Sequence, residues 1–245
     1  MPQVNGIKYK YIGQKFQLKD GSIVEIVNYR NYRDVDVKIE TGEIIQHIFI
    51  SQLKYGMMRN PYKRNIFGRG YVGVGKYRTD SIFYRIWHHM FYRCYSPDAY
   101  KTYEKCEVCE EWYNYQTFAE WCSKNYRENF ALDKDILVSG NKIYSPNTCC
   151  FVPQEINNQF YSSNFNDENF GVKKASINSY QIRIKKHGES VYLGSYMDRN
   201  EAIKVYCDEK EKHIHYLAEL YKPEISEIVY NKLKEFKINR EIYNQ

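Results

Sequence analysis

The sequence lacks long apolar runs. No stretch of 18 apolar residues occurs among its 245 residues, so we expect no transmembrane helix. Residues 1–11 also lack the apolar core of a secretory signal peptide. We therefore expect a cytoplasmic protein without a membrane partner. Its seven cysteines are then expected to remain reduced or to bind a metal, rather than to form disulfides.

Acidic residues are almost absent from residues 54–93. This segment contains nine Lys or Arg residues against a single acidic residue, a net charge of +8, whereas the whole chain carries +6. Five glycines in residues 54–80 disfavour regular structure, which predicts a basic, Gly-rich linker. Such a segment suits a nucleic-acid backbone, because each phosphate contact releases condensed counterions. The alternative is a solvated linker without a partner. The candidate contacts are Arg64, Arg69, Lys76 and Arg78.

Period-two apolar runs are concentrated in residues 1–53. Val35-Asp-Val-Lys-Ile alternates apolar and polar residues, and Asp20-Gly21 and Thr41-Gly42 are typical of tight turns between strands. We expect a small antiparallel β domain here, barrel-like and similar to an SH3-like barrel, with no residues that suggest chemistry.

Helical and strand patterns alternate over the rest of the chain, which predicts an α+β protein of several small domains. Apolar spacing predicts helices over residues 81–93 and 115–125. A helix from about Arg199 to Leu220 is expected to begin at Asp198 as its N-cap. The expected divisions are a domain of residues 81–160, a polar linker at 161–169, a module of residues 170–222 and a C-terminal helix in residues 223–245.

The module of residues 170–222 has three predicted strands, at 171–176, 180–186 and 190–196. In the middle strand, apolar Ile182 and Ile184 alternate with polar residues, so Arg183 and Lys185 share the face that points away from the helix. A sheet with a basic outer face can enter the DNA major groove as a β-ribbon does. The alternative is a basic face that only keeps the protein in solution.

This module also contains a family-like pattern. Gly171-Val172, Tyr180-Gln-Ile-Arg-Ile, Leu193-Gly-Ser-Tyr and Glu201-Ala202 occur in this order. The pattern resembles the plant ethylene-response (APETALA-type) DNA-binding domain, which also occurs fused to phage homing endonucleases. In that family the sheet reads the major groove of double-stranded DNA. The contacts that the resemblance implies are Lys173, Lys174, Tyr180, Arg183, Lys185 and Tyr192.

A second set of motifs spans about residues 80–160. Trp87-His-His-Met, Val108-Cys-Glu-Glu-Trp, Leu132-Asp-Lys-Asp and Tyr144-Ser-Pro-Asn-Thr-Cys follow one another. They look like phage HNH-type homing endonucleases, whose ββα-metal core places two strands and a helix around one divalent ion. Phosphodiester hydrolysis needs a general base and a hard cation. The resemblance implies Mg²⁺, held by Asp133 and by Asn157 or Asn158.

Two signature positions of that family differ in this chain. Lys134 stands where a typical member has histidine, and Thr148 stands at the central Asn position. Lys134 could instead hold a phosphate and Tyr144 could transfer a proton, which makes Asp133, Lys134 and Tyr144 the candidate catalytic residues. His88 and His89 fall on the predicted upstream helix, where a structural role is expected.

The cysteines offer one more candidate site. Cys106-x-x-Cys109 has zinc-knuckle spacing, and Cys94 and Cys149 could complete a structural Zn²⁺ site. No second CxxC motif occurs, and buried free thiols are the alternative.

Three functions are compatible with these features. The first is a metal-dependent, sequence-recognising DNA endonuclease of the HNH homing type. The second is a catalytically degenerate DNA-binding or regulatory protein, which would explain the missing histidine. The third is a protein-interaction role, such as a phage factor that inhibits a host defence enzyme.

Overall fold

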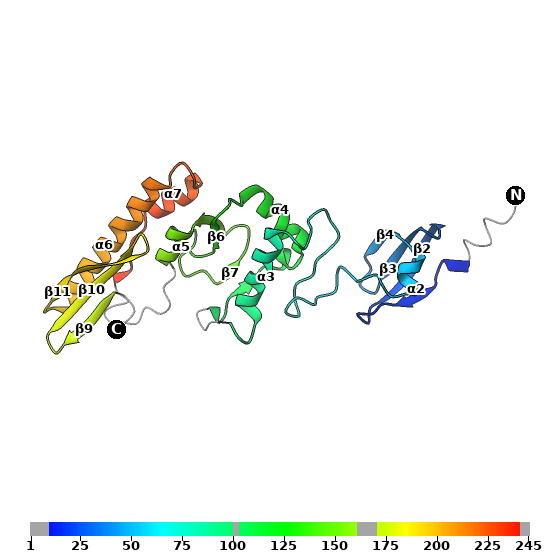
Figure 1. The fold of residues 1–245 in the computed structure, drawn as a ribbon, viewed down its shortest axis with the longest axis horizontal. Helices are drawn as coiled ribbons and strands as arrows, with labels where there is room; N and C mark the ends of the chain where they lie inside the picture. The colour runs from blue at the N-terminus through cyan, green and yellow to red at the C-terminus, as the bar shows by residue number, and fades with distance from the viewer. Residues whose placement is uncertain (1–9, 100–102, 161–170, 241–245) are drawn as a thin grey trace.

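The computed structural model of the protein describes residues 10–99, 103–160 and 171–240. Its parts follow one another along the long axis, from the N-terminal sheet through the central helices to the C-terminal sheet and helices (Figure 1). Helices and mainly antiparallel sheets alternate, which confirms the expected α+β class. The linker expected at 161–169 lies outside the described residues. Among the described helices, none combines the length and apolar character that a membrane crossing requires.

The N-terminal part is an open antiparallel sheet with one short helix. Its elements are β1 (Lys15–Gln17), β2 (Ile23–Asn31), β3 (Asp34–Ile39), β4 (Ile44–Ile48) and α2 (Ile50–Lys54). The strands pair in the order β1-β2-β3-β4, and the described strands contain no β1–β4 pairing of the kind that closes a barrel. The described strands therefore form the small antiparallel β domain that was expected, but the barrel-like closure is wrong. After β4 the chain turns into α2, and Leu53 of this helix fills the core that further strands would have covered.

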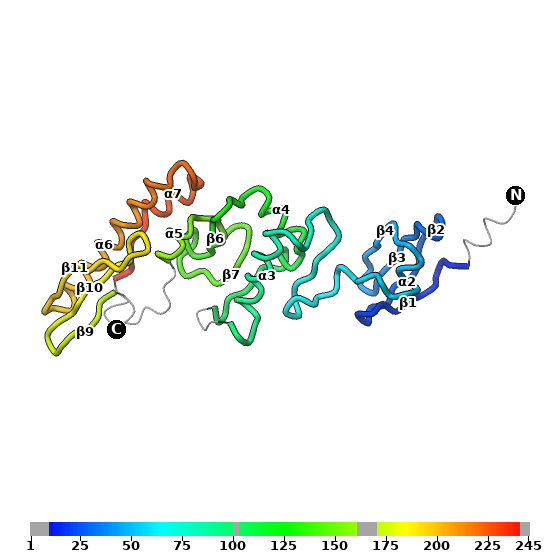
Figure 2. The backbone as a smooth tube through the Cα atoms, viewed as in Figure 1, coloured from blue at the N-terminus to red at the C-terminus, as the bar shows by residue number. Residues whose placement is uncertain are grey.

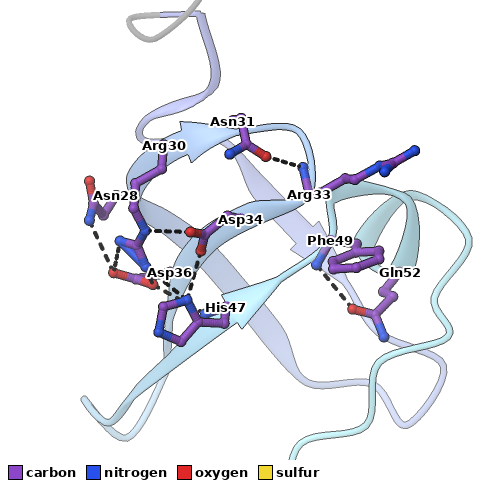
Figure 3. A network of polar contacts seen from close by, with 9 residues as sticks. All are labelled: Asn28, Arg30, Asn31, Arg33, Asp34, Asp36, His47, Phe49 and Gln52. Carbon is purple, nitrogen blue, oxygen red and sulfur yellow. Dashed lines mark hydrogen bonds and ion pairs between the residues drawn. The ribbon is translucent and has the colours of Figure 1, made fainter.

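Asp36 of β3 is a buried carboxylate in this sheet, only 5% exposed. Arg30 of β2 donates from Nη1 to its Oδ2 at 2.9 Å, and Asn28 donates to the same oxygen at 3.1 Å. Arg30 also donates from Nε to Asp34 Oδ2 at 2.8 Å, and His47 Nδ1 of β4 lies 2.9 Å from Asp34 Oδ1 (Figure 3). These contacts join three strands and account for the buried charge, because a buried carboxylate needs paired hydrogen-bond donors.

The central part is built around an aromatic core. Its elements are α3 (Ile82–Tyr95), β5 (Glu107–Val108), the 3₁₀ helix η2 (Glu110–Tyr113), α4 (Tyr115–Asn125), β6 (Phe130–Asp133), β7 (Ile143–Tyr144), β8 (Cys150–Pro153) and α5 (Gln154–Phe160). Helices α3 and α4 confirm the two helices expected from apolar spacing. Trp87, Trp112 and Phe118 are fully buried where these helices meet η2. Strand β6 pairs antiparallel with β8, and α5 follows β8 directly and packs on both strands.

The basic segment between α2 and α3 runs as loops, with isolated bridges rather than strands (Figure 2). It nevertheless packs on the central core. Tyr71 donates its backbone N–H to Tyr113 O at 2.8 Å and accepts from Tyr115 N at 2.9 Å. A Cβ at Gly70 would lie 2.9 Å from the Trp87 ring, so this glycine permits a close backbone approach. In the structure this segment therefore packs on the aromatic core of the central part.

The C-terminal part contains β9 (Val172–Ser176), β10 (Ser179–Lys186), β11 (Glu189–Tyr196), α6 (Arg199–Leu220) and α7 (Glu227–Lys234). The sheet order is β11-β10-β9. Asp198 Oδ1 accepts from the backbone N–H groups of Asn200 and Glu201, which confirms it as the N-cap of α6. Within the described part of residues 223–245 the expected C-terminal helix is α7, which covers eight residues and ends at Lys234, and residues 241–245 of that prediction lie outside the described residues.

Helix α6 belongs to two hydrophobic cores. Its N-terminal half packs Ala202 and Tyr206 on the sheet, against Val172 and Ile182. Its C-terminal half packs in a different cluster that combines α7 with β8 and α5, with members Ile136, Cys150, Val152, Ile156, Ile214, Leu217, Ala218, Ile225, Val229 and Leu233. The three-stranded module and the β6–β8–α5 unit therefore share one continuous helix as part of their cores.

Candidate nucleic-acid interface and ββα core

The outer face of the three-stranded sheet is built by strand alternation. Ile182 and Ile184 of β10 point toward α6 and are 0% and 2% exposed, so the intervening residues point outward. Register extends this face, because directly paired residues of antiparallel strands share a side. Gln181 pairs with Lys173 and Ser195, Arg183 with Tyr192, and Lys185 with Ser190. Lys173, Arg183, Lys185 and Tyr192 therefore lie on one side of the sheet.

Arg183 is oriented by an aromatic neighbour. Its guanidinium carbon lies 5.4 Å from the centroid of the Tyr192 ring, a cation–π distance. The Tyr192 hydroxyl is hydrogen-bonded with Ser195 Oγ at 2.7 Å, which fixes the ring from its other end. Neither contact neutralises the arginine, so the guanidinium keeps its charge and its donors for a ligand.

Charge on this face is uncompensated. Within the described residues, Lys173 and Lys185 form no ion pair. Lys186, on the opposite side of β10, is instead paired with Glu209 of α6 at 3.2 Å. The outer face therefore presents positive charge to solvent, whereas the charge of Lys186 on the inner side is paired.

Two of the expected sheet contacts lie elsewhere. Tyr180 shares the side of Ile182 and packs partly buried against the core between the sheet and α6. Lys174 pairs with Tyr180 in the register and so belongs to the same side, although its side chain is exposed. The structure removes both from the outer face, because the period of two places residue 180 with 182 and 184.

The four expected contacts in the basic segment divide into two pairs. Lys76 is 3.4 Å from Glu120, and Arg78 is 2.7 Å from Asp80. Arg64 and Arg69 instead lie over aromatic rings, 5.7 Å from the Tyr113 centroid and 4.8 Å from the Tyr95 centroid. Only the second pair keeps an uncompensated charge.

Asp133 closes β6 at the position of the expected metal ligand. It is 7% exposed, and its Oδ1 accepts backbone N–H groups of Asp135 and Ile136, both at 2.7 Å. Burial raises the pKa of Asp133, and these two hydrogen bonds partly oppose that rise. The carboxylate therefore shapes the turn after β6 with one oxygen, which leaves the other oxygen for a ligand.

Lys134 and Tyr144 are buried beside this turn. Lys134 Nζ donates to both carboxylate oxygens of Asp135 at 2.7 and 2.8 Å and to the carbonyl of Asn141 at 2.8 Å. Tyr144 is 2% exposed, and burial raises the pKa of its hydroxyl. The ammonium already has three acceptors and the phenol is shielded from water. As they stand, neither is arranged to exchange a proton with an external ligand.

The other motif positions are also engaged within the fold. Thr148 donates from Oγ1 to the carbonyl of Ile143 at 2.7 Å. On α5, Asn158 is exposed and accepts from Gln154 Nε2 at 2.8 Å, and Asn157 is half-buried. His88 packs against Phe67 with ring centroids 5.3 Å apart, in keeping with the structural role expected for it.

The donor set around Asp133 suits Mg²⁺ only in part. One carboxylate with an amide oxygen from α5 would need phosphate oxygens and water to complete an octahedral shell, as Mg²⁺ sites commonly use. In the described part of the chain, no group of three or more His, Cys, Asp or Glu side chains is placed to hold a metal ion. A histidine base beside Asp133 is missing because Lys134 occupies that position.

The four cysteines proposed for zinc are free thiols. Cys106 and Cys149 are buried and Cys94 and Cys109 are half-buried. Burial raises the pKa of all four, to about 12 for Cys94 and Cys149. Zinc binds the deprotonated thiolate, so the raised pKa values oppose zinc binding. The zinc site stays a prediction.

A polar junction between the sheet and the β6–β8–α5 unit was not anticipated. His187 Nδ1, in the turn between β10 and β11, lies 2.8 Å from Glu155 Oε1 of α5. Tyr221 donates to Glu155 Oε2 at 3.0 Å, and the His187 ring lies 5.5 Å from the ring of His213. No sequence pattern indicates this junction, because its members are distant along the chain.

Comparisons with protein-family models, with curated proteins and with solved structures yield no match for this chain. The two family resemblances therefore rest on the quoted motifs alone.

Proposed function

We propose that this protein binds double-stranded DNA through the outer face of the β9–β10–β11 sheet. The observation that carries the proposal is the row formed by Lys173, Arg183 and Lys185, which has no acidic partner within the described residues and includes an arginine held over Tyr192. A flat basic β surface fits the width of the major groove, where an arginine can donate two hydrogen bonds to guanine. Lysines on the same face would contact phosphates and fix the register.

A double variant tests this proposal. Arg183→Ala with Lys185→Ala should weaken binding to a fluorescently labelled mixed-sequence duplex by about tenfold or more, because a base-contacting arginine contributes roughly 1–3 kcal/mol. The matched control is Lys212→Ala with Lys124→Ala, which removes two exposed lysines already paired with Glu209 and Glu120. Equal affinities of the two variants in fluorescence anisotropy would contradict the proposal.

A second candidate function is metal-dependent cleavage of the bound DNA. It is favoured by the order β6, β8, α5, in which an antiparallel strand pair leads directly into a packed helix and Asp133 ends the first strand. Asp133 with Asn157 or Asn158 would hold Mg²⁺, which would stabilise charge on the scissile phosphate. A DNA-binding protein without cleavage is the competing account, since Lys134 replaces the base and is itself tied to Asp135.

Plasmid cleavage separates these two accounts. Supercoiled plasmid with Mg²⁺ should be nicked or linearised by the wild type and left intact by Asp133→Ala if the unit is catalytic. Equal cleavage by both proteins, or none by either while DNA binding is retained, would assign the unit a non-catalytic role. If DNA binding is also absent, a protein partner becomes the better account.

A further inference from the structure

Helix α3 has an exposed face without acidic residues. None of its residues from Ile82 to Tyr95 is Asp or Glu. Arg85, His89 and Tyr92 are exposed and recur at the spacing of one helix face, while Trp87 and Phe91 are buried on the opposite side. The solvent side of this helix is thus basic and aromatic.

The loop that precedes α3 packs along this helix and carries two further arginines. The ring centroid of Phe67 lies 5.3 Å from that of His88 and 6.2 Å from that of Tyr92, so residues around position 67 pack alongside α3. Two positions on, Arg69 lies over Tyr95 at the C-terminal end of α3 and donates to the Tyr113 hydroxyl at 3.2 Å. Arg64 lies over the ring of Tyr113 as well.

Three arginines of α3 and the preceding loop carry charge without a carboxylate partner among the described residues. Within the described residues, Arg64, Arg69 and Arg85 form no ion pair with a carboxylate. Aromatic contacts restrict a guanidinium without neutralising it, which leaves its N–H groups available to oxygen ligands.

We infer that Arg64, Arg69 and Arg85 form a second contact for duplex DNA, directed at the phosphate backbone. The inference rests on the proposed DNA-binding function and extends it from the sheet to the central part of the chain. Phosphate oxygens are the ligands that planar, fixed guanidinium groups bind best. Arginines directed at phosphates rather than at base edges would bind all sequences alike and release counterions in proportion to the contacts made.

Salt dependence measures these contacts directly. The variant Arg64→Gln, Arg69→Gln, Arg85→Gln should bind mixed-sequence duplex DNA about tenfold or more weakly at low salt, to a similar degree for every duplex tested. Its plot of log affinity against log salt should be shallower by about 2 to 3, since each lost phosphate contact contributes about 0.9 to the slope. Circular dichroism and the melting temperature establish that the variant is folded.

The matched control removes the same charge from paired side chains. Lys15→Gln, Lys124→Gln, Lys212→Gln changes three exposed lysines that pair with Glu25, Glu120 and Glu209. A salt slope within about 0.5 of the wild type is expected for it. If the arginine variant shows the same slope as this control, the inference is overturned.

The outcome for the sheet is separable. Loss of binding only in the Arg183→Ala, Lys185→Ala variant would retain the proposed function and overturn the second contact. Loss of DNA binding only in the variant Arg64→Gln, Arg69→Gln, Arg85→Gln would support the contact at α3 and contradict the proposed role of the sheet. We expect an unlabelled acidic peptide to displace DNA from neither surface. If the protein binds this peptide but has no measurable affinity for DNA, the inference is overturned in favour of a protein partner.

Discussion

Gly171 occupies a position that admits no side chain. Its φ is +73°, and a Cβ there would lie 2.1 Å from the carbonyl oxygen of Arg183 and 2.5 Å from the Tyr206 ring. Gly188, in the turn between β10 and β11, has a similar φ of +82° with nothing within 4 Å of such a Cβ. An L residue would therefore meet similar backbone strain at either position, but only position 171 also lacks room for its side chain.

This pair makes a stability prediction. Gly188→Ala should lower the free energy of unfolding by about 1–2 kcal/mol, the usual cost of a left-handed conformation for an L residue. Gly171→Ala should cost clearly more, because the backbone of β10 or the Tyr206 ring must also move. Differential scanning calorimetry of both variants checks this, and equal decreases in melting temperature would show that the tight contact is absent.

Asp133 makes stability depend on pH. Burial raises its pKa in the folded protein, so the protonated form is favoured there. Its contribution to stability is therefore present below the unfolded-state pKa of about 3.9 and is lost as pH rises through the higher folded-state pKa. Asp133→Asn keeps an acceptor oxygen for Asp135 and Ile136 but has no charge to bury.

The expected result is that Asp133→Asn gains stability relative to the wild type as the pH is raised from about 4, the unfolded-state pKa of the carboxyl group. Urea unfolding without divalent ions, repeated at increasing pH, measures the difference. A difference that does not change with pH would mean that the carboxylate is solvated in the folded state.

Helix α6 links the candidate DNA-binding sheet to the β6–β8–α5 unit. Leu217 is 1% exposed in the cluster with Val152 and Ile156, whereas Leu220, three residues later, is 47% exposed. Leu217→Ala should destabilise the protein by about 2–5 kcal/mol through lost burial and a cavity, and Leu220→Ala by much less.

The decisive readout for this helix is local. Leu217→Ala should reduce hydrogen-exchange protection of amides in β6 and β8, although residue 217 lies more than 60 positions after β8. Loss of protection confined to β9, β10 and β11 would contradict the shared core and restore the view of an independent C-terminal module.

Local patterns were predictable from the sequence, and long-range packing was not. The middle strand was expected at 180–186 and is Ser179–Lys186, and the helix expected at 115–125 is Tyr115–Asn125, because periodicity is a local property. The N-terminal antiparallel sheet was expected, but its open edges were not, since closure depends on which strands pair. The packing of α6 in two hydrophobic cores was also missed. Tyr206 and Leu217 belong to one apolar stripe in the sequence, which does not show that they pack against different elements.

The same division applies to the candidate site. Arg183 and Lys185 were assigned to one face by alternation alone, and the register adds Lys173 and Tyr192 to it. The pairing of Lys76 with Glu120 could not be foreseen, because the two residues are 44 positions apart. The hydrogen bonds from Lys134 to Asp135 and Asn141 could not be foreseen either, because they depend on burial of the turn after β6.

At the scale of the whole molecule, the two basic surfaces proposed for DNA binding belong to different parts of an elongated chain, one to the β9–β10–β11 sheet and one to α3 and the loop before it (Figure 1). Helix α6 packs the sheet against the β6–β8–α5 unit. A DNA duplex bound by the sheet would therefore be presented at a fixed offset from Asp133. This arrangement suits either cleavage or occlusion at a set distance from the recognised bases.

The central claim, that the sheet is the DNA-binding surface, is tested most directly by NMR chemical-shift mapping. A ¹⁵N-labelled sample is titrated with an unlabelled mixed-sequence duplex. The account predicts that the largest amide and side-chain shift changes fall on Lys173, Arg183, Lys185 and Tyr192, with small changes at Ile182 and Ile184 behind them. Changes that avoid β9, β10 and β11, or a saturating titration that leaves Arg183 unaffected, would contradict it.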